Sequence, residues 1–293
     1  MTAVLEAPVT EGTPASPVRS RPARVLVWSL AAVSFLSAWA VAYTVVIGAA
    51  EQHSAQVRLY ATFREQLAQG VAPLDIAREG RPVALLHIAG LGLDQVVVEG
   101  VTSTDLELGP GHRRGTVLPG QSGTSVVYGK AATFGAPFAR LAQLHKGDAI
   151  MVTTSQGEFT YHVSGFRRAQ DPQPKPVVEG TGHLVLVTAT GSGALRRFTP
   201  HRVLFVDATL SKAAPAARPT VATIAEERVF AADRQALFGL VCWLLGLVAV
   251  VIASVWTWGR WGRWQCWVAF SPVVVAVLVG ASGPAAGLLP NLL

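Results

Sequence analysis

The stretch Leu184–Thr190 reads LVLVTAT and lies near the end of a region rich in short apolar segments. Branched aliphatic and threonine side chains favour extended backbone, so these residues predict a buried β-strand. Alternate side chains on a strand point to opposite faces of its sheet. If Ala189 faces a groove, Thr188 and Thr190 therefore face away from it.

The region around this stretch, from Pro82 to Leu210, is divided into short β-rich segments by glycine, proline and polar turns. Such spacing predicts a barrel or a sandwich. One or two helical turns are expected at Pro137–Leu144, and the proline-rich Asp171–Pro176 is expected to be a loop. The predicted strands are Val83–Ile88, Val96–Val98, Ser125–Tyr128, Ala149–Thr154, Phe159–Phe166, Leu184–Thr188 and Val203–Val206.

Three long uncharged stretches flank the β-rich region: Val25–Ala50, Ala236–Gly259 and Trp264–Leu293. Each exceeds the roughly 20 residues that a helix needs to cross a hydrocarbon core. A composition of 51% apolar and 14% charged residues also favours a membrane protein. We expect transmembrane helices at 25–50, 236–259 and 264–290, the third kinked or ending near Gly283.

Basic residues set the expected orientation of these spans. They cluster before the first span and between the second and third, at Arg19, Arg21, Arg24, Arg260 and Arg263. By the positive-inside rule, both clusters belong in the cytoplasm. This predicts a multi-pass plasma-membrane protein with a cytoplasmic N-terminus and with residues 51–235 outside. A cleaved signal peptide is the alternative for the first span, whose apolar stretch is long for that role.

The remaining segments have simple expectations. Residues 1–24 are rich in proline, alanine, serine and threonine and are predicted to be disordered. Residues 51–80 are expected to form a juxtamembrane helix and linker, because apolar residues recur there at helical spacing. Residues 81–210 form the β domain and 211–235 a second linker. The net charge of +6 is explained by topology and lipid headgroups, so no nucleic-acid partner is expected.

Five segments follow one another in the order found in a known family: VALLHIAGLGL (83–93), DQVVVEG (94–100), GPGHRRG (109–115), LPGQSGTSVVYG (118–129) and FARLAQLHKGDAI (138–150). With the LVLVTAT stretch, they make residues 81–207 resemble a sortase, of the class E/F type found in actinobacteria. The resemblance implies a mainly β sortase-type barrel outside the membrane of a Gram-positive cell, here combined with three transmembrane α-helices.

Sortases cleave LPxTG-type sorting signals through a thioester, using a cysteine, a histidine and an arginine. In this chain residues 185–189 stand where the family has T-L-x-T-C, so Ala189 replaces the cysteine. Lys130 stands at the histidine position, after Gly129. Arg202 resembles the family's arginine. The resemblance therefore implies a catalytically degenerate pseudo-sortase in which no catalytic residue is expected.

A substitute chemistry is the enzymatic alternative. The two cysteines, Cys242 and Cys266, lie in or beside predicted spans, so neither supplies an external thiol. A serine or threonine, with Ser192 as a weak candidate, would need a base. Lys130 can serve as that base only if its pKa falls far below about 10.4.

The groove candidates are His112, Lys130, Thr188 and Arg202, with Arg196 and Arg197 as alternative arginines. His112 either lines the groove or bonds to the backbone of its turn. Lys130 is expected to be an exposed charge or a cation that holds a carboxylate-bearing partner. The seven histidines form no H-x-x-x-H or H-E-x-x-H pair, so no metal and no cofactor is expected.

Three functions follow. The first is a non-catalytic binding or assembly module for a cell-surface protein or membrane complex, whose partner is a cell-envelope protein or a peptide of sorting-signal character. The second is a cysteine-independent transpeptidase or peptidase. The third is a structural subunit in which the barrel is a spacer, with small residues such as Gly280 and Gly283 allowing close helix contacts.

Overall fold

The computed structural model of the chain describes residues 34–36, 38–39, 41–73, 77–172, 180–190, 202–216, 236–258, 263–287 and 292. The chain divides into a unit of residues 1–40 and a unit of residues 41–293. The expectations for the tail 1–24, the start of the first span, most of the 171–176 loop and the linker from residue 217 lie outside the described residues.

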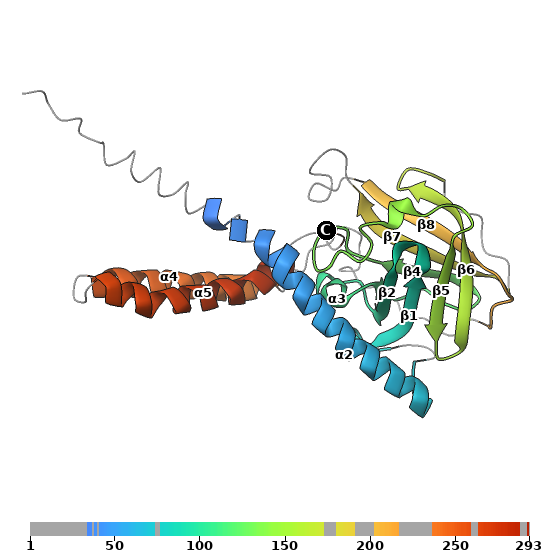
Figure 1. The fold of residues 1–293 in the computed structure, drawn as a ribbon, viewed down its shortest axis with the longest axis horizontal. Coiled ribbons are helices and arrows are strands. Elements are labelled where there is room, and N and C mark those ends of the chain that lie inside the picture. Colours follow the sequence, from blue (N-terminus) through green and yellow to red (C-terminus); the bar gives the residue numbers. More distant parts are fainter. Residues whose placement is uncertain are drawn as a thin grey trace, which may run out of the picture. The chain divides into compact units, whose positions relative to one another are not determined.

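Eight strands close into one barrel in the order β1-β2-β3-β4-β7-β8-β6-β5 (Figure 1). The pairs β2–β3 and β4–β7 are parallel, and the other pairs described are antiparallel. The mainly β barrel predicted from the sequence is confirmed. The strands are β1 (Pro82–Ile88), β2 (Leu93–Glu99), β3 (Gly111–His112), β4 (Gly123–Tyr128), β5 (Ala149–Thr154), β6 (Gly157–Arg168), β7 (Gly182–Thr190) and β8 (Arg202–Leu210).

Short and long helices lie between and around the strands. The helical turn expected at residues 137–144 is a 3-10 turn, while α3 and the two-residue strand β3 were not predicted. The helices are the π-helical η1 (Tyr43–Ile47), α2 (Gly48–Gln69), η2 (Ala89–Leu91), α3 (Ser103–Leu108), η3 (Leu141–Gln143), α4 (Ala236–Trp258) and α5 (Arg263–Gly287).

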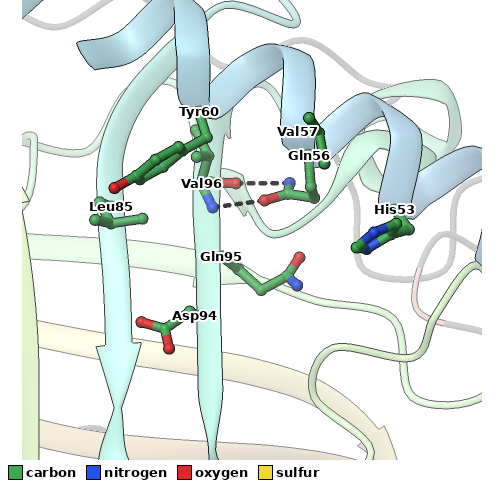
Figure 2. A pocket seen from close by; sticks show the side chains of 8 residues that line it. All are labelled: His53, Gln56, Val57, Tyr60, Leu85, Asp94, Gln95 and Val96. Atoms are coloured by element: carbon green, nitrogen blue, oxygen red, sulfur yellow. Dashed lines mark hydrogen bonds between the residues drawn. The ribbon is translucent and has the colours of Figure 1, made fainter.

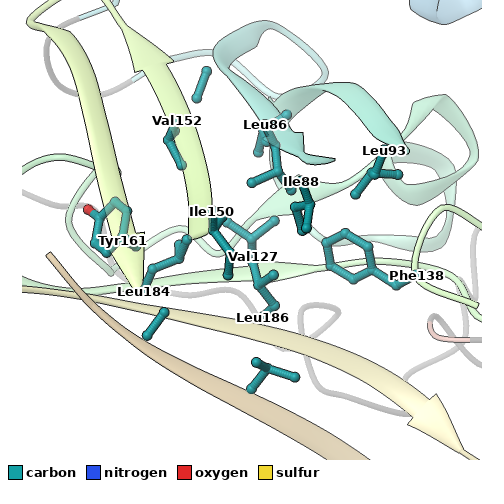
Figure 3. Close-up of a cluster of buried hydrophobic side chains, with 14 of the residues drawn as sticks. Leu86, Ile88, Leu93, Val127, Phe138, Ile150, Val152, Tyr161, Leu184 and Leu186 are labelled. Atoms are coloured by element: carbon teal, nitrogen blue, oxygen red, sulfur yellow. The ribbon is translucent and has the colours of Figure 1, made fainter. Parts of the chain in front are cut away.

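The barrel interior is filled by inward-facing apolar side chains of the longer strands (Figure 3). On β7 the even-numbered Leu184 and Leu186 point inward and are fully buried. Tyr161 crosses the interior, where its hydroxyl accepts a hydrogen bond from the Gly120 N–H at 2.6 Å. Burial raises the pKa of Tyr161 to about 12. The inward face is therefore a sealed apolar core.

The opposite face of β4, β7 and β8 carries a second apolar group, which we call the outer cluster. The odd-numbered residues of β7 belong to it, because side chains alternate along a strand. Its members come from the three strands, from α3, from the segments beside α3 and β4, and from the region after α5. They are Val101, Leu106, Tyr128, Ala131, Val185, Val187, Ala189, Val203 and Leu292.

Helix α2 is fixed to the barrel by the amide of Gln56 (Figure 2). Its Nε2 donates to the carbonyls of Val96 and Leu108, at 3.1 and 2.8 Å, and its Oε1 accepts from the Val96 N–H at 2.7 Å. One side chain thus pairs with strand β2 as a neighbouring strand would. A cavity of about 350 Å³ lies beside this contact, between α2 and β1–β2.

Replacing Gln56 with leucine is expected to lower the free energy of unfolding by about 2 kcal/mol. The change leaves the buried N–H of Val96 without its acceptor, and such orphaned groups cost about 1–3 kcal/mol. Pulse proteolysis over a urea series, on the full chain in mild detergent, measures the difference. Gln69→Leu is the matched control, since the exposed Gln69 donates to Glu65 in the preceding turn of the same helix. Equal losses in both variants would contradict the anchoring role.

Helices α4 and α5 lie side by side and contain windows, Leu237–Ser254 and Val268–Ala285, long and apolar enough to cross a membrane (Figure 1). A Cβ added to Gly280 would lie 2.4 Å from the ring of Trp243, so a glycine permits their close approach. Helix α5 continues through Pro284 to Gly287. The helix therefore passes Gly283 and Pro284 before it ends, because apolar helices tolerate proline where neighbours compensate.

Candidate functional site

The parallel pairing of β4 with β7 brings the positions of Lys130 and Ala189 together. Tyr128 is the register partner of Val187, and the Gly129 N–H continues the ladder by donating to the Val187 carbonyl at 3.0 Å. The Thr188 hydroxyl, next to Ala189, donates to the carbonyl of Gly129, next to Lys130, at 2.9 Å. Ala131, on the other side of Lys130, belongs to the outer cluster together with the buried Ala189.

Lys130 is fully buried, which contradicts the expectation of an exposed charge. Among the described residues, no group accepts a hydrogen bond from its Nζ. The ammonium instead lies 5.2 Å from the centroid of the Phe134 ring, within range of a cation–π interaction. Burial lowers the pKa of Lys130 to about 8, and the nearby carboxylate of Glu107 opposes this shift.

The burial of Lys130 is caused by the segment that follows it, residues 131–138, which folds back over the strand end. Phe138 donates its N–H to the Lys130 carbonyl at 3.1 Å, and its ring occupies the space that a Cβ on Gly129 would fill. Phe134 and Ala136 have φ values of +48° and +45°, a left-handed backbone that costs energy in non-glycine residues.

This strained segment is also attached to the helix that precedes the barrel. The Phe134 N–H donates to the carbonyl of Thr44 in η1 at 3.0 Å. A Cβ on Gly48, at the start of α2, would lie 2.9 Å from the Phe134 ring, so glycine permits the contact. The cover over Lys130 is therefore held from both the barrel and the entry helix.

Helix α3 forms another part of this cover and carries Glu107, the carboxylate that acts on Lys130. Thr102 and Asp105 form a capping box at its start, with the Thr102 hydroxyl donating to Asp105 at 2.7 Å. Leu106 points into the outer cluster. This helix is not among the elements predicted from the sequence, although a threonine followed three residues later by an acidic residue is a helix-start signal.

Arg202 lies next to Ala189 in the sheet but on the other face. In the antiparallel β7–β8 ladder, Arg202 is the partner of Thr190, whereas Ala189 is opposite Val203. Directly paired residues share a face, so Arg202 points away from the outer cluster. Its side chain is exposed at the start of β8. Arg196, Arg197, Ser192 and His201 lie outside the described residues.

Thr188 does not line the outer face either. Its side chain is buried on the inward face of β7 and donates a hydrogen bond from Oγ1 to the Gly129 carbonyl at 2.9 Å. Of the four groove candidates, Thr188 and Arg202 both have their side chains on the face opposite to that of Ala189. Thr188 instead fixes the ends of β4 and β7 against each other.

His112 is buried away from any open groove and bonds at both ring nitrogens. Nδ1 lies 3.0 Å from Glu99 Oε2, and Nε2 lies 2.9 Å from the Val117 carbonyl oxygen. The turn-bonded interpretation of His112 therefore describes its geometry. Glu99, the carboxylate partner, was not singled out from the sequence. Within the described ranges, no group of histidine, cysteine and acidic residues could hold a metal ion.

The chemistry available at this site is that of a buried amine beside a methyl group. An alanine side chain cannot form a thioester or any other acyl intermediate. The ammonium of Lys130 can donate charge-assisted hydrogen bonds to an anion, for which the described protein offers no acceptor. The hydroxyls of Ser103 and Thr133, on the covering segments, are likewise buried without a described partner.

Comparison with known proteins matches residues 86–209 to the Sortase domain family model. The chain is 34% identical to Sortase D of Bacillus subtilis (strain 168) over 84 residues, which is 29% of this chain. The match spans 41% of that relative.

Solved structures with a similar fold include a Clostridium perfringens Sortase D5 transpeptidase, at 22% identity and a TM-score of 0.45, covering 54% of this chain and 98% of that one. Sortase E from Streptomyces avermitilis shows 28% identity and a TM-score of 0.39, covering 52% of this chain and 100% of that one.

Proposed function

Because the chain belongs to the sortase family through its domain at residues 86–209, we propose that it is a non-catalytic member that binds a carboxylate-bearing protein segment. The binding site is the outer cluster, next to Lys130 and Ala189. The observation that carries the proposal is the buried Nζ of Lys130, which has no described hydrogen-bond acceptor.

The loss of transpeptidase chemistry follows from the side chains at the two key positions. Ala189 carries no nucleophile, and the chain's cysteines, Cys242 and Cys266, are far from the barrel in sequence. An imidazole both gives and accepts protons near neutral pH. Lys130 cannot replace it in catalysis, because the site has no nucleophile for the lysine to activate. The fold thus retains a peptide-sized face while the reacting group is absent.

A carboxylate on the partner satisfies the site electrostatically. A buried ammonium without an acceptor costs free energy, and a charge-assisted hydrogen bond to a carboxylate removes that cost. The outer cluster would hold the apolar side chains next to that carboxylate. A sorting-signal-like peptide with an acidic residue or a free C-terminus would offer this combination of apolar residues and a carboxylate, and so would an acidic segment of a cell-envelope protein.

The apolar helices α4 and α5 support a membrane location for this binding module. We propose that α4 and α5 cross the plasma membrane of a Gram-positive cell with their connecting turn, which contains Arg260, inside. The barrel then lies on the external side, where it reaches a partner at the cell surface. A membrane complex in which the barrel is only a spacer would instead tolerate changes at Lys130.

A second candidate, a cysteine-independent peptidase, is favoured by one observation. Because burial lowers the pKa of Lys130 to about 8, a share of this amine is neutral near physiological pH and able to accept a proton. The hydroxyl nearest in sequence to Ala189 on its N-terminal side is Thr188, which points into the barrel and donates to the Gly129 carbonyl. The described site therefore offers this base no aligned nucleophile.

Binding is tested with the full chain in detergent and a library of fluorescent hexapeptides, each made with a C-terminal carboxylate and with a C-terminal amide. Some carboxylate peptides are expected to bind at least 10-fold more tightly than their amides. In Lys130→Met, the two forms should bind equally, whereas Lys146→Met, which alters an exposed lysine, should keep the difference. No preference for the carboxylate in the unchanged protein would overturn the proposal.

Catalysis is tested by mass spectrometry after incubation with sorting-signal peptides. The unchanged chain is expected to yield neither product nor covalent adduct, whereas Ala189→Cys combined with Lys130→His should form a thioester adduct. The single change Ala189→Cys is the control, because it adds the nucleophile without the histidine base and so shows what each of the two changes contributes. Product release by the unchanged chain that disappears in Lys130→Ala would establish the enzymatic alternative.

A further inference from the structure

Leu292, which follows α5 in the chain, is fully buried in the outer cluster. We propose that the segment carrying Leu292 occupies the binding site of its own chain and must leave before a partner binds. The inference rests on the proposed function, because it names what fills that same site. The occupant is thus a part of this protein rather than a separate ligand.

Two kinds of contact carry the inference. The side chain of Leu292 shares the outer cluster with Leu106 of α3 and with Ala189 of β7. Its carbonyl oxygen accepts a hydrogen bond from the Ala131 N–H at 3.2 Å, directly after Lys130. A side chain in an apolar site together with a main-chain hydrogen bond at its rim is how a bound peptide makes contact.

The composition of the segment agrees with such a covered position. Residues 288–293 read LLPNLL and contain no charge. Burying one leucine side chain contributes about 1.5–3 kcal/mol relative to leaving it in water. With the turn before Arg263 in the cytoplasm, the far end of α5 emerges on the side of the barrel, so the segment is on the correct side of the membrane to reach the site.

The tether to α5 is short. Leu292 lies five positions after Gly287, the end of the helix, and five extended residues span at most about 18 Å. A short tether gives an effective concentration in the millimolar range, so a contact too weak to hold a free peptide holds this segment. A separate partner has to compete with it, which lowers that partner's apparent affinity.

Cysteine labelling of the full chain tests the occupancy. In a Cys242→Ser, Cys266→Ser background, Ala189→Cys places a thiol under the segment, and its rate of reaction with a membrane-impermeant maleimide is measured. We expect a rate at least 10-fold below that of the exposed control Glu158→Cys. Adding Leu292→Asp should raise the rate at least 10-fold, and adding Leu292→Met should leave it low.

A cross-link supplies the second measurement, which does not depend on the accessibility of a cysteine at position 189 to maleimide. Oxidation of Ala131→Cys with Leu292→Cys, in the same background, should join the two positions within one chain. The control pair Glu158→Cys with Leu292→Cys should remain reduced. A labelling rate that does not respond to Leu292→Asp, or the absence of the Ala131–Leu292 cross-link, would overturn the inference.

The two proposals fail in different ways. If the carboxylate peptides bind and Leu292→Asp leaves both labelling and affinity unchanged, the site exists but the segment does not cover it. If labelling and the cross-link establish the cover but no carboxylate peptide binds even in Leu292→Asp, the covering segment is real and the binding function is wrong. If the segment covers the site and the site binds carboxylate peptides, the Leu292→Asp variant should bind those peptides at least 10-fold more tightly than the unchanged protein.

Discussion

Replacing Lys130 with methionine is expected to raise the free energy of unfolding by about 3 kcal/mol at pH 7. Burial lowers the pKa of Lys130 from 10.5 to about 8, and each pKa unit corresponds to about 1.4 kcal/mol. Methionine has a similar length and no charge to desolvate. Glu107, the opposing carboxylate, is half-buried and still reaches solvent after the change.

The pH dependence of the free energy of unfolding distinguishes the cost of burying a charge from an effect of packing alone. Below pH 8 both the folded and unfolded states carry the proton on Lys130, so the full cost of burying the charge is present. Between pH 8 and 10.5 the folded state loses that proton before the unfolded state does, so the stability of the unchanged protein rises with pH. The advantage of Lys130→Met should therefore shrink across this window.

Urea titrations by pulse proteolysis at pH 7, 8, 9 and 10 measure the two curves. Lys146→Met is the matched control, because it removes a lysine that is exposed on the barrel, and its curve should run parallel to that of the unchanged protein. A constant difference between Lys130→Met and the unchanged protein from pH 7 to pH 10 would contradict a charged, buried ammonium. A lysine that costs stability at its own position is expected at functional sites, where local rules are broken for a purpose.

The barrel was accessible from the sequence, because most of its strands have strong β-rich patterns. The burial of Lys130 was not accessible, because its cover comes from residues 131–138 and from α3, whose start signal at Thr102 is short. A single strand pattern does not reveal which distant segment lies over its end.

The face of Arg202 shows a second limit. A one-residue change in the register of β8 moves every side chain of that strand to the other face of the sheet. The register therefore decides whether Arg202 lies on the same face as Ala189. The register follows from the ladder that pairs Thr190 with Arg202, and no local pattern in the HRVLF stretch determines it. The resemblance to the family's arginine therefore located the strand but not the direction of the side chain.

The partner of His112 shows a third limit. Glu99 ends the apolar strand β2, and His112 belongs to β3, which has two residues. A strand so short has no detectable alternation, so the parallel pairing of Glu99 with His112 cannot be foreseen. The pairing makes the histidine a component of barrel closure, since β3 lies between β2 and β4.

Replacing His112 with alanine is expected to lower the free energy of unfolding by about 3 kcal/mol, because two buried groups lose their hydrogen-bond partner and each such loss costs about 1–3 kcal/mol. The side chains of His112 and Glu99 are 1% and 4% exposed, so the carboxylate left behind has little access to water. The Val117 carbonyl only accepts hydrogen bonds, so Nε2 carries a proton and its loss orphans that carbonyl as well. The same urea titration measures the loss.

The chain contains its own matched control, because His87 and Asp94 form an exposed pair of the same chemical kind. Their side chains are 38% and 68% exposed, so His87→Ala should cost less than about 1 kcal/mol. Glu99→Gln, which keeps an acceptor near Nδ1, should cost less than His112→Ala. Equal losses in His112→Ala and His87→Ala would contradict a role of His112 in barrel closure. Of these two histidine–carboxylate pairs, the buried pair of His112 and Glu99 is the one that joins β2 to β3. Because Gly111 of β3 also pairs with Tyr128, two residues before Lys130, losing His112 should loosen the strand end that holds the buried lysine.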